Sequence, residues 1–209
     1  MSEYKKQSII GFTVLIHPDV LVHGDDTKQL LIELKSQLEG INEVVPQPQL
    51  SSLKNMKIWV EWLANDKGIA EFHESRQWLR NNGYNLEKEF GIEIKNTRNF
   101  VKWSRLEQPW VIMHELAHGY HNRVLGNDYA VIEAAYRHAL MTKLYQAVPH
   151  INISRGKINA YAIKNSREYF AELTEAYFGK NDFFPFNRQE LAAYDVIGFR
   201  MMQGVWRGQ

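Results

Sequence analysis

The order of short apolar runs and helical patterns is the feature that most restricts the fold of this chain. Three runs of apolar and β-branched residues, at 9–16, 57–62 and 91–95, are typical of β-strands. Residues 46–52, PQPQLSS, lie between the first two runs and are typical of a turn. The second half carries helical patterns instead. Strands that precede a run of helices predict an α+β fold with a small twisted sheet.

Four helices are expected in the second half. Asn165 and Asn187 can each cap a helix start, and Gly179 can end the first of these two helices. The four expected helices cover about 109–124, 127–145, 165–179 and a stretch from 187 onward.

Length and composition predict one globular domain, 1–209, with 44% hydrophobic and 23% charged residues. The 25 basic and 24 acidic residues leave a formal charge of +1, so no basic field predicts a nucleic acid or an anionic membrane as partner. The absence of cysteine excludes disulfides, thiol nucleophiles and thiolate metal sites. Any chemistry must use histidines, carboxylates, hydroxyls or a bound metal.

The sequence contains no signal for membrane insertion or export. No apolar run approaches the roughly 18 residues of a membrane span. Residues 1–20 are interrupted by polar side chains and lack a small-residue cleavage site, so they predict a strand and not a signal peptide. These observations are compatible with a cytoplasmic chain. The compartment stays open, because secreted proteins can also lack cysteine.

Residues 114–118, HELAH, carry the strongest chemical signal. Positions i and i+4 share one face of a helix, so His114 and His118 can each present a ring nitrogen to one Zn²⁺ at about 2.0–2.1 Å. Glu115 lies beside them and can accept a proton from a metal-activated water. The flanking apolar residues predict a mostly buried helix. Two buried imidazoles without a ligand would be costly, which favours a metal site over two core histidines.

A tetrahedral catalytic zinc needs a third protein ligand. One extension of the pattern places a further histidine six residues after the second, but Val124 occupies that position. His121 lies three residues beyond His118, and its place along the helix favours a position nearer solvent. Val124 cannot bind a metal, and His121 is a weak candidate for the third ligand.

A carboxylate from the 165–179 helix is the stronger candidate. Glu168, Glu172 and Glu175 lie at i, i+4 and i+7, so they share one helix face, while aromatic and apolar residues cover the rest. Like charges on one face destabilise a bare helix, and a cation opposite that face would remove the penalty. The spacing leaves open whether Glu168 or Glu172 binds the metal.

HELAH, followed later by EYFAE, resembles the gluzincin class of zinc metallopeptidases. Residues 161–172, YAIKNSREYFAE, are similar to the catalytic domain of anthrax lethal factor, in which a Tyr, three residues, an Asn and two residues precede Glu-Phe-Phe-Ala-Glu. The likeness to lethal-factor-like peptidase domains covers about residues 110–180. It implies a zincin-like domain that hydrolyses peptide bonds in a peptide or protein substrate.

The resemblance also implies a role for each matched residue. Glu115 would be the general base, and the Tyr161 hydroxyl would hydrogen-bond the oxyanion. The zinc ligands would be His114, His118 and Glu168.

Three other residues receive separate expectations. Glu172 would accept a hydrogen bond from a metal-binding imidazole, which fixes the tautomer of the ring. Glu175 would be a solvated surface charge. His73 is interpreted as an ordinary polar histidine, although it could touch substrate.

Two other functions stay open. The chain could be a non-catalytic peptide-binding or regulatory protein that holds zinc structurally, although Glu115 argues against this because a closed structural site needs no base. A metal-dependent hydrolase of a non-peptide amide is the other alternative. For a peptidase, we expect an edge strand, formed by residues 91–95, to pair with an extended substrate.

Overall fold

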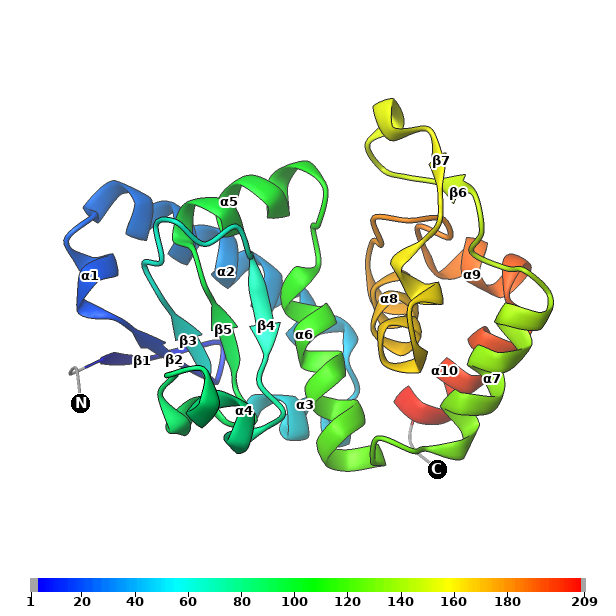
Figure 1. The fold of residues 1–209 in the computed structure, drawn as a ribbon, viewed down its shortest axis with the longest axis horizontal. Coiled ribbons are helices and arrows are strands. Elements are labelled where there is room, and N and C mark those ends of the chain that lie inside the picture. The colour runs from blue at the N-terminus through cyan, green and yellow to red at the C-terminus, as the bar shows by residue number, and fades with distance from the viewer. Residues whose placement is uncertain (1–3, 208–209) are drawn as a thin grey trace.

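The computed structural model describes residues 4–207 and has the predicted α+β fold (Figure 1). Its main sheet has the strand order β1-β2-β3-β5-β4. Strands β2, β3 and β5 run parallel, while β1 and β4 are antiparallel to their neighbours and form the two edges. The strands are β1 (Lys5–Ile9), β2 (Phe12–Ile16), β3 (Ile58–Val60), β4 (Ala70–Phe72) and β5 (Ile92–Ile94).

Helix α6 lies between this sheet and the C-terminal helices (Figure 1). It contacts β4 on one side and α8 on another. A two-stranded sheet, β6 (Val148–Pro149) with β7 (Lys157–Ile158), lies between α7 and α8 in the chain. The α-helices are α1 (Pro18–Leu21), α2 (Gly24–Val44), α3 (Gln47–Lys54), α4 (Arg76–Asn81), α5 (Thr97–Leu106), α6 (Val111–Tyr120), α7 (Ala130–Met141), α8 (Ser166–Phe178), α9 (Arg188–Tyr194) and α10 (Val196–Trp206).

The first predicted strand, 9–16, is in fact the end of β1, a turn and the whole of β2, which together belong to a hairpin. Ile9 pairs with Phe12, so Ile10 and Gly11 form a two-residue turn between β1 and β2. Both turn residues have positive φ, 50° and 84°, as tight hairpin turns with the right twist require. The apolar run masked this turn because isoleucine is a rare residue at positive φ.

Residues 46–52 were expected to form a turn, and this prediction is wrong. Pro46 is the N-cap of α3, and Pro48 lies in its first turn. A proline costs no hydrogen bond there, because the first N–H groups of a helix have no partner within the helix. The buried side chains of Leu50 and Leu53 hold α3 against the core.

The third predicted strand is present as β5, but it is not an edge strand. It pairs with β3 on one side and with β4 on the other. Strand β4, which the sequence analysis did not identify, forms the edge beside α6. Its three residues are only half-buried and include Glu71, so they lack the pattern of a strand.

The predicted helix starts differ in accuracy. Asn165 caps α8 through its side chain, and Asn187 does the same for α9, as expected. In contrast, Tyr129 is the N-cap of α7 and makes no side-chain cap hydrogen bond. Helix α6 ends at Tyr120 and continues as a π-helical turn, His121–Leu125.

The buried hydrophobic residues form a continuous core that joins the sheet to the C-terminal helices. It includes side chains from β2, α2, α6, α8 and α10, which fixes α6 and α8 relative to each other. Within residues 4–207, no helix is long and apolar enough to cross a membrane.

Candidate metal centre

Helix α6 places residues 114–118 against the sheet edge. Its apolar side chains Ile112, Met113 and Leu116 are buried in the core, so the remaining face carries His114 and His118. Gly119 permits the close approach of the next layer: a Cβ there would overlap the Met56 sulfur and press on the Phe72 ring of β4. Local packing therefore brings the histidines next to the edge strand.

Helix α8 supplies the carboxylate. The Asn165 side chain accepts hydrogen bonds from the backbone N–H groups of Arg167 and Glu168, which fixes Glu168 in the first turn of the helix. Aromatic and apolar residues of α8, Phe170 and Leu173 among them, are buried in the shared core. The acidic face is thereby turned toward α6.

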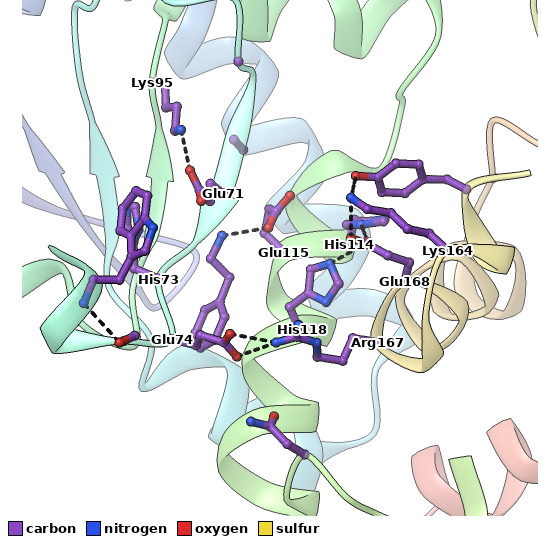
Figure 2. A pocket seen from close by; sticks show the side chains of 17 residues that line it. Glu71, His73, Glu74, Lys95, His114, Glu115, His118, Lys164, Arg167 and Glu168 are labelled. Atoms are coloured by element: carbon purple, nitrogen blue, oxygen red, sulfur yellow. Dashed lines mark hydrogen bonds and ion pairs between the residues drawn. The ribbon is translucent and has the colours of Figure 1, made fainter. Parts of the chain in front are cut away.

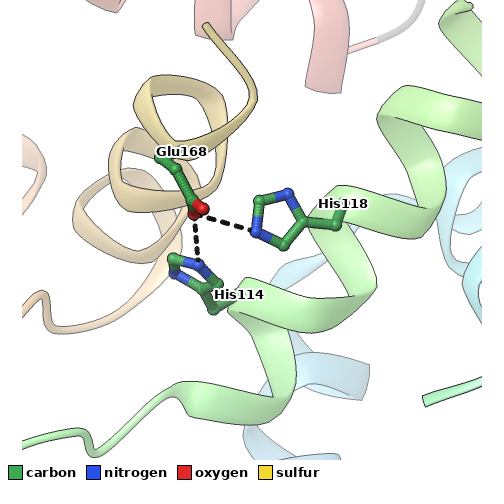
Figure 3. Close-up of side chains that lie close together, drawn as sticks. All are labelled: His114, His118 and Glu168. Atoms are coloured by element: carbon green, nitrogen blue, oxygen red, sulfur yellow. Dashed lines mark hydrogen bonds and ion pairs between the residues drawn. The ribbon is translucent and has the colours of Figure 1, made fainter. Parts of the chain in front are cut away.

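His114, His118 and Glu168 converge on one point (Figure 3). Glu168 Oε2 lies 3.2 Å from His114 Nε2 and 3.1 Å from His118 Nε2. Donor atoms around a tetrahedral zinc with bonds of about 2.0–2.1 Å are about 3.3 Å apart. Two imidazole nitrogens and a carboxylate oxygen at this spacing fit a zinc ion and leave room for a fourth ligand.

The charges of this cluster are coupled. Burial disfavours the charged form of His114, but its hydrogen bonds to Glu168 and Glu175 outweigh burial and raise its pKa well above the usual value. Burial also acts to raise the pKa of Glu168, yet the hydrogen bonds to His114 and His118 lower it far below the usual range. His114 and Glu168 therefore each favour the charged form of the other.

The structure assigns the carboxylate behind His114 to Glu175 and corrects the expectation for Glu172. His114 Nδ1 donates to Glu175 Oε1 at 2.7 Å, whereas its distance to Glu172 Oε1 is 4.0 Å, too long for a hydrogen bond. Glu175 is only 3% exposed, so it is not the solvated surface charge that the sequence predicts. This contact orients the ring so that Nε2 faces Glu168.

Glu115 is held by the edge strand. Its Oε2 accepts a hydrogen bond from the backbone N–H of Phe72 at 2.8 Å. The side chain is buried, but it lines the cavity that contains the two histidines. The general base expected from the sequence therefore has a fixed orientation, through a backbone group that no side-chain pattern reveals.

Tyr161 lies at the start of a 3₁₀ turn, Tyr161–Ile163, and lines the same cavity. Its side chain is 43% exposed, and its hydroxyl accepts a hydrogen bond from Lys164 Nζ at 2.6 Å. Lys164 also lies 3.7 Å from Glu168 Oε1. Lys164 is not among the residues predicted from the sequence, although its spacing of three residues from Tyr161 and four from Glu168 could have indicated it.

These residues surround a cavity of about 560 Å³ between β4 and α8, with α6 behind it (Figure 2). Arg167 of α8 pairs with Glu74, just after β4, through Oε1 at 2.7 Å and Oε2 at 2.8 Å, and so closes one end. Lys95 pairs with Glu71 farther along the strand. The cavity therefore has the form of a groove along the sheet edge.

Three other histidines, His73, His121 and His150, are buried and lie outside the converging set, and the first two bear on the sequence predictions. His121 is 1% exposed, which corrects the expectation of a position nearer solvent, and burial lowers its pKa to about 4. His73 lines the cavity, but its Nε2 is hydrogen-bonded to Glu93 at 2.5 Å. Lys88 completes that buried ion cluster, so His73 has a structural partner that its sequence neighbours do not reveal.

No family model, curated protein or solved structure matches the chain. The resemblance to gluzincins therefore stays a prediction that rests on the residues of α6, α8 and the turn at Tyr161.

Proposed function

We propose that this chain is a zinc-dependent metallopeptidase of the gluzincin type, with a zincin-like fold. The observation that carries the proposal is the convergence of His114 Nε2, His118 Nε2 and Glu168 Oε2 from two separate helices. Glu115 lines the same cavity, as the base of such an enzyme must. The zinc ligands are His114, His118 and Glu168.

Bound zinc would supply a Lewis acid that polarises the scissile carbonyl and lowers the pKa of water. Glu115 would take the proton from the attacking water and pass it to the leaving amine. The hydrogen bond from Phe72 occupies Oε2 of Glu115, which directs Oε1 to this proton transfer. The edge strand thus orients the base before substrate binds.

Tyr161 would stabilise the oxyanion. Its hydroxyl oxygen accepts from Lys164, so the hydroxyl proton is available to donate to the substrate. The positive charge of Lys164 beside the hydroxyl strengthens that donation. The energy of the bond would be gained mainly in the transition state, where negative charge develops.

The substrate backbone would add to strand β4 and not to residues 91–95. His73 donates to Gly91, and Lys95 donates to Ile69, so alternate residues of the strand face β5. The backbone groups of Ala70 and the carbonyl of Phe72 therefore point away from the sheet, toward the cavity, while the Phe72 N–H is paired with Glu115. An extended peptide is the ligand that fits such an edge.

The test is an elemental analysis of purified protein, followed by digestion of a peptide library with and without a chelator. One zinc per chain and chelator-sensitive cleavage are expected. Glu115→Gln should keep the zinc and lose turnover by about 100-fold or more. Full turnover in the Glu115→Gln variant would contradict the proposal. If zinc is bound but no peptide is cleaved, the alternative of a non-catalytic zinc-containing peptide-binding or regulatory protein is favoured.

A further inference from the structure

A second cavity, of about 470 Å³, adjoins the proposed metal centre. It shares His114, Glu115 and Tyr161 with the first cavity and extends from them between α6, α8 and the segment after α8. In a bound peptide, the side chain of the residue next to the scissile bond would therefore reach this second cavity directly.

The inner wall of this cavity is acidic. Glu172, Glu175 and Asp182 all line it, and each is at most 5% exposed. Glu175 accepts the hydrogen bond of His114, and Glu172 accepts a long one, 3.4 Å, from the Asn181 amide. Among the described residues, Asp182 has no side-chain donor within hydrogen-bond distance and is reached only by the backbone N–H groups of residues 182 and 183.

Asp182 provides the observation that points to a ligand. Its Oδ1 is buried and has no hydrogen-bond partner within residues 4–207. Leaving a buried carboxyl oxygen unpaired costs free energy, and burial together with Glu175 raises the pKa of this carboxyl to about 7. A donor that enters the cavity from outside would remove this cost.

The cations around the cavity do not balance the inner wall. Arg155 pairs with Glu107 at 2.5 Å, and its side chain is 44% exposed. Its charge is therefore paired at the rim of the cavity and not with the inner wall. His150 Nε2 lies 3.9 Å from Asp182 Oδ2, beyond hydrogen-bond distance. Burial lowers the pKa of this imidazole, which favours its neutral form. The remaining cation of the lining, Lys67, lies in the loop before β4.

A second metal ion fits this wall less well than an organic cation. The possible ligand set is His114, Glu172 and Glu175. Its imidazole would have to bind one ion through Nδ1 and another through Nε2, and a neutral imidazole has only one free lone pair. An ammonium or guanidinium group instead brings several N–H donors for separate carboxyl oxygens.

We propose that this acidic cavity binds the lysine or arginine side chain of a substrate residue next to the scissile bond. The proposal rests on the peptidase function and adds its substrate class, which is peptides with a basic residue at the cleavage site. The cavity would act through its charge: it pairs the basic group with Asp182 and excludes acidic side chains.

The experiment uses the zinc-loaded full chain and peptides that differ at one position beside the bond cleaved. Lysine is compared with norleucine, which has a similar length but no ammonium group. The lysine peptide should have a kcat/KM higher by about tenfold or more, since hydrogen bonds to charged groups are strong. Asp182→Asn should reduce this preference by about tenfold. Asp25→Asn, a control at an exposed position outside both cavities, should leave the preference unchanged.

Equal cleavage of the two peptides, or an unchanged preference in Asp182→Asn, would overturn the assignment. So would a second zinc per chain that this variant loses. Absence of cleavage throughout the library would instead refute the peptidase function. Calorimetry with the Glu115→Gln protein separates the two failures: tighter binding of the lysine peptide, weakened by Asp182→Asn, supports the cavity, and equal binding of both peptides refutes it.

Discussion

Replacement of Glu175 by glutamine should weaken zinc binding more than the same replacement at Glu172. Glu175 Oε1 accepts the Nδ1 proton of His114 at 2.7 Å, while Glu172 lies 4.0 Å away. A carboxylate in this position makes the opposite ring nitrogen a better metal ligand, and its loss typically costs 10–100-fold in affinity. Glutamine keeps the volume and a neutral acceptor, so we expect about tenfold for Glu175→Gln and less than about threefold for Glu172→Gln.

The measurement is a zinc titration in competition with a chromogenic chelator, at one pH for all proteins. Glu39→Gln, at an exposed position on α2, is the matched control and should bind zinc as the wild type does. Thermal unfolding of the metal-free proteins checks that each variant is folded. A larger loss in Glu172→Gln than in Glu175→Gln would refute the role of Glu175 and restore the assignment made from the sequence.

Three further outcomes are expected. Glu168→Ala should lower zinc occupancy after dialysis more than either glutamine variant, since it removes a donor atom from the converging set; one zinc per chain in this variant would contradict the site. Tyr161→Phe should retain zinc and lower kcat by about 10–1000-fold, and a change in KM alone would make Tyr161 an ordinary binding contact. The wild type should lose stability as the pH falls, and His121→Leu should abolish the part of this loss that is due to His121. The pKa of His121 falls from 6.5 to about 4 on folding, so the unfolded chain binds more protons and the wild type is destabilised between those values as pH falls. From neutral pH to about pH 4.5 the unfolding free energy in urea should fall by about 2 kcal/mol more in the wild type than in His121→Leu, and equal changes would refute a neutral buried imidazole.

The local parts of the candidate site could be predicted from the sequence. The i, i+4 spacing of His114 and His118 fixes their common helix face, and Asn165 marks the start of α8. Both features depend on residues within one or two turns of each other. Their convergence with a carboxylate of α8 depends on tertiary packing. The acidic face of this helix indicated such a ligand, and the resemblance to a known family chose Glu168 over Glu172.

The partner of His114 could have been found by helix geometry. At about 100° per residue, Glu175 is rotated by only about 20° from Glu168, whereas Glu172 is rotated by about 40°. Position i+7 thus lies almost directly along the axis from Glu168, two turns away. Counting one turn, as the sequence analysis did, favoured the wrong carboxylate.

The contacts of the edge strand could not have been found in this way. The Phe72 N–H that holds Glu115 belongs to a half-buried three-residue strand with no alternating pattern. Its pairing with β5 is decided by which strands lie adjacent in the sheet, and the chain order does not give that order. The same reason placed 91–95 wrongly at the edge.

Net charge is a poor guide to the substrate because it does not tell where the individual charges lie in the fold. The formal charge of +1 indicates no preference for a charged partner. Folding nevertheless gathers Glu168, Glu172, Glu175 and Asp182 around one imidazole, while most of the basic side chains stay at the surface. Charges that are buried and close together act at a lower dielectric than charges in solvent. Burial raises the pKa of Glu172, Glu175 and Asp182, so a cation that enters the cavity would favour their ionised forms. The proposed preference for a basic side chain rests on this local arrangement and not on the net charge.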